Sequence, residues 1–159
     1  MASEPEPRRE QILQRVVSLL EAIPARSPDR FPIVRVERTW RPIESCNEFP
    51  VYIVEPAGHG STGSTLQLNA QTVIYRHDYR FTVYGYFRGD DETSVWTWIE
   101  RGWDMASKQI LSQPGLGGLV LRVDPEGPRE LDMLAPDTGL AAFAQDWAAD
   151  FNEDFPVAA

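Results

Sequence analysis

The stretch VIYRHDYRFTVYGYFR, residues 73–88, decides the fold. Its odd positions from Val73 to Phe87 read Val, Tyr, His, Tyr, Phe, Val, Gly and Phe. Its even positions are largely polar and include Arg76, Asp78, Arg80, Thr82 and Arg88. Such an alternation predicts a strand of roughly 50 Å with one buried and one wet face. A strand of this length must twist or bend, and we expect the bend at Gly85.

An amphipathic helix is predicted before this strand. Apolar residues recur at spacings of three and four between Ile12 and Ile23, which gives one apolar stripe. Ser3 and Glu6 have the spacing of a capping box, with a proline between them for the first turn. The prolines that follow Ile23 predict the end of the helix.

Two strands and a loop are predicted between the helix and residue 73. The alternation from Phe31 to Trp40 indicates a half-buried strand, and residues 41–49 a loop. The apolar run Val51–Val54 is typical of a strand covered on both faces. The segment PAGHGSTGST, residues 56–65, lacks both periodicity and bulky anchors, so we expect a mobile loop there.

A second helix and further turns are predicted after residue 88. Gly89-Asp90-Asp91 is expected to cap the helix, and Pro114 and Gly115 to stop it. Its buried seam is predicted as Trp96, Ile99, Trp103, Ala106 and Ile110. Residues 119–123 alternate as a strand, and residues 124–137 contain enough proline and glycine to predict turns.

The last element fits two periods. Phe143, Trp147, Phe151 and Phe155 fall at helical steps of four, yet with the intervening alanines they also fit period two. Whether residues 139–152 form a helix or a strand stays open on this pattern, and we predict a strand. The expected fold class is α+β, a mixed or antiparallel sheet of about four to five strands with two helices packed on one face. We expect a single domain over residues 1–159, with an ordered core of about 8–153 and a flexible N-terminus, loop 57–65 and C-terminal tail.

Composition argues against several functions. The chain has 159 residues and a net charge of −9, which disfavours binding to phosphate backbones. No apolar run is long enough to span a bilayer, and the charged start MASEPEPRRE does not resemble a signal peptide. The single cysteine, Cys46, cannot form a disulfide within the chain.

The sequence offers few side chains that could carry out catalysis. Glycines flank His59, but the lysine of a phosphate-binding loop is missing, so a flexible loop is the better interpretation. We interpret His77 as a buried histidine that is hydrogen-bonded by a neighbour, because no second ligand is placed beside it. The acidic residues 90–92 are explained by helix capping better than by a metal site. We therefore expect no enzyme activity, no cofactor and no metal.

A contact surface is the stronger hypothesis. A strand face of alternating arginine and aspartate can pair with a second copy, although an ordinary solvent-facing sheet explains it equally well. The predicted interface residues are Arg76, Asp78, Arg80 and Arg88 of the strand and His59, Ser61 and Thr62 of the loop.

The order of elements resembles the tail-terminator, or tail-completion, proteins of long-tailed bacteriophages and related gene-transfer particles. The resemblance covers about residues 8–153. It runs from the helix REQILQRVVSLLEAI through FPIVRVERTW and FPVYIVE to the long strand, the second helix and a terminal strand pair. Its local markers are Tyr84-Gly85-Tyr86 followed by Gly89-Asp90-Asp91, and residues 114–118 (PGLGG) after the helix.

This resemblance implies a virion protein that is made in the host cytoplasm and located at the head-proximal end of the tail. Six copies would form a ring that caps the tail tube, ends its polymerisation and joins the head connector, or neck. The expected partners are the chain itself, as a hexamer, the tail-tube protein and the connector. DNA would cross the lumen without being read. Two alternatives stay open: a neck or tail-tube subunit of the same particle, and a small bacterial binding or regulatory domain.

Overall fold

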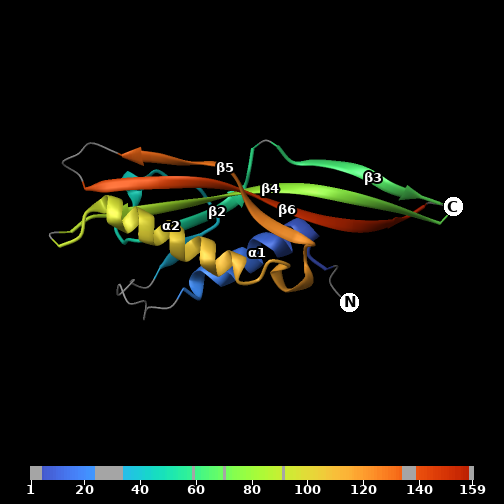
Figure 1. Cartoon of the computed structure of the whole chain (residues 1–159), viewed down its shortest axis with the longest axis horizontal. Helices are drawn as coiled ribbons and strands as arrows, with labels where there is room; N and C mark the ends of the chain where they lie inside the picture. Colours follow the sequence, from blue (N-terminus) through green and yellow to red (C-terminus); the bar gives the residue numbers. More distant parts are fainter. Residues whose placement is uncertain are drawn as a thin grey trace.

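The protein is described by a computed structural model that covers residues 5–23, 34–58, 60–69, 71–90, 92–133 and 139–157. It has an α+β fold in which a mixed sheet packs against two helices (Figure 1). The elements in chain order are α1 (Arg8–Glu21), β1 (Arg35–Glu37), the 3₁₀ turn η1 (Ile43–Ser45), β2 (Val51–Pro56), β3 (Thr62–Leu68), β4 (Thr72–Arg88), α2 (Val95–Leu111), the 3₁₀ turn η2 (Leu116–Gly118), β5 (Arg122–Met133) and β6 (Leu140–Pro156).

The sheet is built around β4. The strand order is β1-β2-β4-β6-β5, and β3 pairs with the part of β4 that β2 leaves free. Among the described strands, β1 and β2 are parallel and the other pairs are antiparallel, so the sheet is mixed. β4 and β6 are antiparallel and pair residue for residue from Thr72 with Pro156 to Arg88 with Leu140. The structure thus confirms the predicted fold class and the long strand, with six strands instead of four to five.

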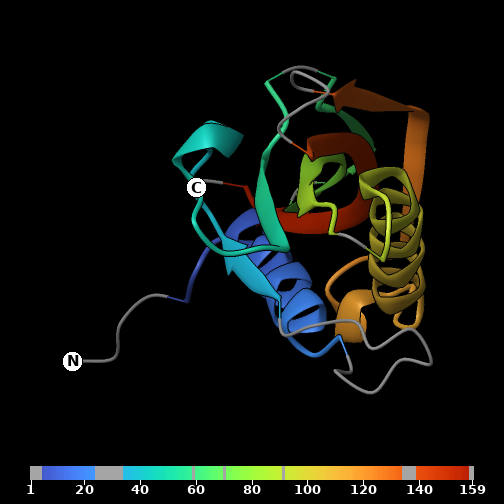
Figure 2. The ribbon, with the colours of Figure 1, turned by 90° about the vertical axis from the view of Figure 1, so that its left-hand side faces the viewer.

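One end of the sheet projects as an arm. We use this name for β3 with residues 72–78 of β4 and residues 150–156 of β6. The arm extends beyond the N-terminal end of α1, while both helices lie against the remainder of the sheet (Figure 1). Seen along its length, the sheet is strongly twisted and curved (Figure 2). The twist is the ordinary consequence of strand chirality, and it accumulates over strands of this length.

The main core lies between the sheet and the two helices. It contains the inward-facing residues of β4 and β6 and the apolar faces of both helices, including Phe81, Phe87, Phe143, Trp147, Ile12, Leu20, Ile99 and Ile110, all nearly inaccessible to solvent. Burying a large apolar side chain stabilises the fold by roughly 1.5–3 kcal/mol relative to exposure. The odd face of β4 is therefore the buried face, as its alternation predicts.

Gly85 makes room for an aromatic ring. A Cβ atom at Gly85 would lie 2.3 Å from Cε1 of Phe143, its cross-strand neighbour on β6. The register between β4 and β6 shows no shift at this position. The predicted bend at Gly85 is therefore not marked by a bulge. The missing side chain of Gly85 instead leaves room for the Phe143 ring, which stacks with Phe87 at a distance of 6.0 Å between the ring centres.

A smaller apolar cluster covers part of the opposite, helix-free face. It contains Ile43, Cys46, Val51, Ile53 and Tyr86. The segment around η1 folds over β2 and β4 here, and the Tyr86 hydroxyl donates a 2.7 Å hydrogen bond to the Arg41 carbonyl. Val51–Val54 is fully buried, which confirms the prediction of a strand covered on both faces.

Both helices begin later than predicted. α1 begins at Arg8 after Pro7, without a side-chain cap, so the proposed capping box is wrong; Ser3 itself lies outside the described residues. Ser94 caps α2 by accepting from the Thr97 amide. Asp90 instead closes the preceding turn by accepting from the amides of residues 92 and 93. The buried face of α2 also differs from the prediction, because Trp96 is 42% exposed and Gly102 packs against Phe87.

Three predicted boundaries were wrong, and in two of them strand pairing overrode local turn signals. The expected loop 56–65 contains the end of β2 and the beginning of β3. The predicted turns after residue 124 are strand β5 as far as Met133, with a register shift between Glu126 and Glu130. The strand expected over 31–40 is limited to Arg35–Glu37 within the described residues. The final segment is strand β6, as predicted, and reaches Pro156.

Candidate interaction surface

The charged side chains of β4 lie on the helix-free face of the sheet. Several of their cross-strand neighbours are also charged: Asp78 pairs with Asp150, which in turn pairs with Arg122 on β5. We call this area the charged face; its charged members are Arg76, Asp78, Arg80, Arg122, Asp124, Glu126, Asp146 and Asp150. A shallow depression of about 330 Å³ lies among them. With three arginines against five carboxylates, the charged face is acidic.

The two central arginines already have partners within the chain. Arg76 bonds Asp150 at 3.2 Å and is about half exposed. Arg80 bonds Asp78 at 3.1 Å and also pairs with Glu126. The hydrogen bond that Arg80 donates to the Asp78 carboxylate raises the pKa of Arg80, and the charge of Glu126 adds to the effect. A second copy would therefore have to compete with internal ion pairs at Arg80, whereas Arg76 is more accessible.

The structure brings most of the predicted interface residues together. The Ser61 hydroxyl accepts a 2.9 Å hydrogen bond from the Arg80 amide, and Thr62 is the strand partner of Asp78. Arg88 is eight positions further along β4, which places it about 26 Å from Arg80. There its guanidinium lies 4.7 Å from the centre of the Phe49 ring. Arg88 therefore belongs to a different surface, and His59 lies outside the described residues.

Aromatic residues line the helix-facing side of the arm. His77 stacks on Phe151 at 4.5 Å, and its Nε2 lies 2.9 Å from a Glu153 carboxylate oxygen. Arg9 at the beginning of α1 reaches the other ring nitrogen at 3.3 Å. These contacts agree with the prediction of a hydrogen-bonded histidine, but the His77 side chain is partly and not fully buried. The described residues hold no group of three or more histidine, cysteine or acidic side chains suited to a metal ion.

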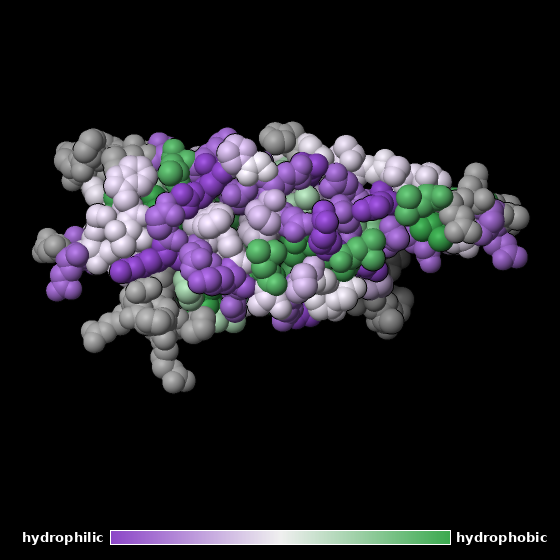
Figure 3. Space-filling view, viewed as in Figure 1, coloured by the Kyte–Doolittle hydropathy of each residue, from purple (hydrophilic) through white to green (hydrophobic). Residues whose placement is uncertain are grey.

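Large apolar side chains are exposed on the arm. Leu66 on β3 is 52% exposed and Phe155 on β6 is 43% exposed. Figure 3 shows an apolar patch near the projecting end and mostly hydrophilic residues over the middle of the molecule. Leu66 and Phe155 were not predicted as surface contacts. Neither the polar stretch around Leu66 nor the position of Phe155 in the last strand indicates that the side chain is exposed.

The described strands at the edges of the sheet are β1, β3 and β5, and of these β5 and β3 differ in their protection. β5 contains Pro125 and Pro128 and several carboxylates, features that discourage pairing with another strand. β3 reads TGSTLQL and has neither charge nor proline. Within the described part of the chain, β3 pairs with β4 alone. Its outer edge is therefore open to strand addition.

A second hollow lies at the other end of the helix-free face. It is lined by Trp40, Pro42, Ile43, Glu44, Tyr84, Tyr86, Glu130, Leu131, Asp132, Ala142, Phe143 and Ala144, and its volume is about 570 Å³. We call it the aromatic groove. The sequence reasoning missed it because its residues come from four separate segments of the chain.

Comparison with known proteins adds no assignment. No protein-family model matches the chain, and no curated protein matches it. Among the described residues, no helix is both long and apolar enough to cross a membrane.

Proposed function

We propose that the chain is a structural virion protein, a tail terminator whose copies form a ring on the tail tube and join it to the head connector. The observation that carries this proposal is the arm, which projects from the helix-covered body and ends in the unprotected strand β3. The two-helix, mixed-sheet fold is the one that the resemblance to tail terminators implies.

An open strand edge offers a means of self-association. Its backbone amides and carbonyls can bond a strand of a neighbour, and these main-chain bonds supply affinity. The contact would use the edge of β3 on one copy and a different surface on the next. Such head-to-tail contacts close into rings when the rotation between copies permits. The apolar residues of the arm would then be buried between copies.

The charge of the chain suits a channel for DNA. With a net charge of −9 and few clustered cations, a lumen wall releases few counterions on contact with phosphates. DNA would therefore pass without being retained. The acidic charged face provides such a surface.

The test is the assembly state of the purified full-length chain. Sedimentation velocity and negative-stain images should reveal a closed species of about six copies, formed alone or on added tail tubes. Long filaments would instead favour a tail-tube subunit. A monomer at every concentration and salt, with and without tubes, would contradict the proposal and favour a small binding domain.

Charged substitutions on the edge of β3 provide the matched variant. Thr62→Lys with Ser64→Lys places two cations on this edge and should abolish the ring by disfavouring strand addition. The control is Thr39→Lys with Ser112→Lys, which makes the same two changes at exposed sites away from the arm. Equal loss of assembly in both variants would argue against the edge of β3 as the contact.

A further inference from the structure

The aromatic groove has a floor of small and aromatic side chains. Tyr84 and Tyr86 on β4 are directly opposite Ala144 and Ala142 on β6. Because alanine is short, the surface is low between β4 and β5, and the tyrosine rings form one side of the hollow. This arrangement requires Tyr-x-Tyr on one strand and Ala-x-Ala on the other, in register.

The two sides of the groove differ in character. On one side Trp40, just before η1, is 50% exposed and apolar. On the other side lie Glu130 and Asp132 of β5, which are directly opposite Ala144 and Ala142 of β6 and therefore share the face of the two tyrosines. Figure 2 shows the η1 segment and the end of β5 on opposite sides of β4 and β6. A concave hollow of this size has the dimensions of a binding site for a few side chains.

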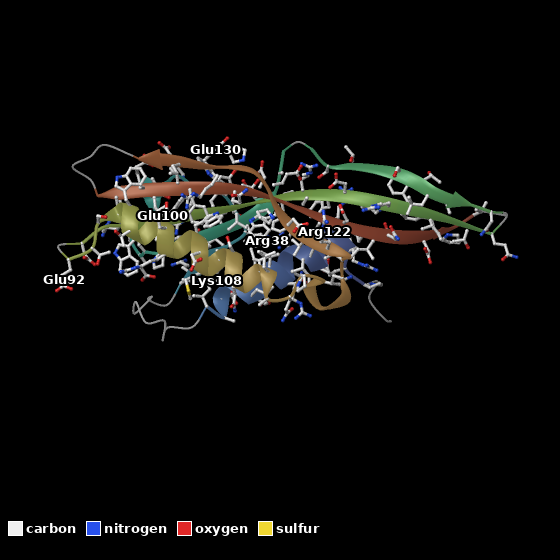
Figure 4. The ribbon with its side chains drawn as sticks, in the orientation of Figure 1. Arg38, Glu92, Glu100, Lys108, Arg122 and Glu130 are labelled. Carbon is white, nitrogen blue, oxygen red and sulfur yellow. The ribbon has the colours of Figure 1, made fainter. Side chains whose placement is uncertain are left out.

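The rim of the groove is acidic. Glu44 on one side and Glu130 and Asp132 on the other line it, and no ion pair joins these three to a basic residue among the described residues. Glu130 lies toward the end of β5 away from the arm, whereas Arg122 is near the middle of the molecule (Figure 4). The basic residue beside the groove, Arg41, is held by both carboxylate oxygens of Glu37.

The tyrosines of the groove experience this negative potential. Burial raises the pKa of Tyr86 to about 12, and the charges of Glu44 and Glu55 add to the effect. Burial likewise raises the pKa of Tyr84, with contributions from Glu55, Asp146 and Glu130.

We propose that the aromatic groove binds an extended segment of a partner protein that carries arginine or lysine beside apolar residues. The cation would lie against the faces of Trp40 and Tyr84, where the ring quadrupole attracts it. The carboxylates of the rim would neutralise it, and the apolar neighbours would pack against Tyr86 and the alanines of the floor. The argument is charge and shape complementarity, and it does not depend on ring formation.

Titration of the full-length chain with the synthetic peptide acetyl-Gly-Arg-Pro-Arg-Gly-amide at low salt tests the proposal. Calorimetry and tryptophan fluorescence are expected to report saturable binding, and the same peptide with glutamine in place of arginine should not bind. No binding of the arginine peptide, or equal binding of the glutamine peptide, would overturn the proposal.

Two variants locate the site. Glu130→Gln with Asp132→Asn should weaken binding roughly tenfold, while Glu92→Gln with Asp104→Asn, at carboxylates outside the groove, should leave it unchanged. Trp40→Ala should weaken binding and remove the fluorescence response with an unchanged melting temperature. Equal weakening by both acidic variants would mean that only the overall charge attracts the peptide, and would overturn the assignment to the groove. Because ring assembly is measured separately, failure of either proposal leaves the other intact.

Discussion

Individual residues stabilise this fold in two ways: glycines leave space for neighbouring rings, and one arginine links α1 to the sheet. Gly85 and Gly102 give space to Phe143 and Phe87, whose rings would meet any added Cβ. Arg38 on the turn after β1 holds Glu10 of α1 with two hydrogen bonds of 2.8 and 3.0 Å and donates a third to the Val54 carbonyl. These contacts fix the position of α1 against the sheet.

Gly85→Ala is expected to lower the free energy of unfolding by about 1–3 kcal/mol, because the new methyl group displaces the Phe143 ring in a packed core. Urea unfolding followed by circular dichroism measures this. Gly58→Ala is the control, because no atom lies within 4 Å of the place that its new methyl group would occupy. Equal effects of the two substitutions would contradict the packing role of Gly85.

Glu10 gives a pH-dependent contribution to stability. The hydrogen bond from Arg38 holds the pKa of Glu10 below its ordinary value of 4.5. The folded state therefore binds this proton less readily than the unfolded state, so the stabilisation is present above pH 4.5 and is lost as the pH falls through the lowered value. Glu10→Gln should flatten the dependence of the unfolding free energy on pH in this window. If the unfolding free energy of Glu10→Gln and of the wild type changed with pH in the same way, this contribution of Glu10 would be refuted.

At the scale of elements, sequence patterns were reliable where a single strand or helix contained its own signal. The alternation of β4 predicts its length and its buried face. β3 was missed because the segment has a glycine and no apolar alternation, and its order comes from pairing with β4. β5 was interpreted as turns because of its prolines, which an edge strand tolerates. The alanines of β6 favour a helix locally, and seventeen pairs with β4 decide for the strand.

The buried face of α2 can be tested by truncation. Ile99→Ala should cost about 2–5 kcal/mol of unfolding free energy, since Ile99 is fully buried between α2 and the sheet. Trp96→Ala should cost less because that side chain is 42% exposed, although the sequence pattern placed it on the buried seam. Chemical denaturation of both variants measures the difference, and a larger loss for Trp96→Ala would refute this orientation of α2.

Substitutions on the charged face can distinguish an effect on the proposed assembly from an effect on folding. Arg76→Glu should weaken the proposed ring with little loss of stability, because Arg76 is exposed and its single ion pair is screened by solvent. Arg80→Glu should lower the urea midpoint more, because it places a carboxylate beside Asp78 and Glu126. Sedimentation and urea unfolding of both variants provide the comparison. Unchanged assembly of folded Arg76→Glu would argue against a contact at this position.

At the scale of the whole molecule, the candidate surfaces were only partly predictable. The alternating charges of β4 point to a contact surface, but their partners Glu126, Asp146 and Asp150 are distant in sequence and become neighbours only through the pairing of β4, β6 and β5. The aromatic groove likewise depends on register between strands. Periodicity reports which side of a strand is buried, and long-range pairing determines which charges meet.

The proposed ring should depend on salt concentration, because each of its copies is acidic. Each copy brings a net charge of −9, so bringing several together is opposed by repulsion that ions screen over about 8 Å at physiological ionic strength. The ring population should therefore rise from very low salt to about 0.15 M. Sedimentation at constant protein concentration measures it. Ring loss over this range would indicate instead that attractive ion pairs dominate the contact.

The continuous pairing of β4 with β6 also has a consequence for how the protein is made. During synthesis, β4 leaves the ribosome well before β6, because α2 and β5 lie between them in the chain. Until β6 emerges, the central strand β4 has neighbours on one side only, and its aromatic residues are not yet packed against those of β6. Such long-range pairing slows folding and exposes apolar surface to aggregation. Slow translation between the two strands would lengthen that exposure, so the yield of native protein should be sensitive to the pace of translation and to chaperones.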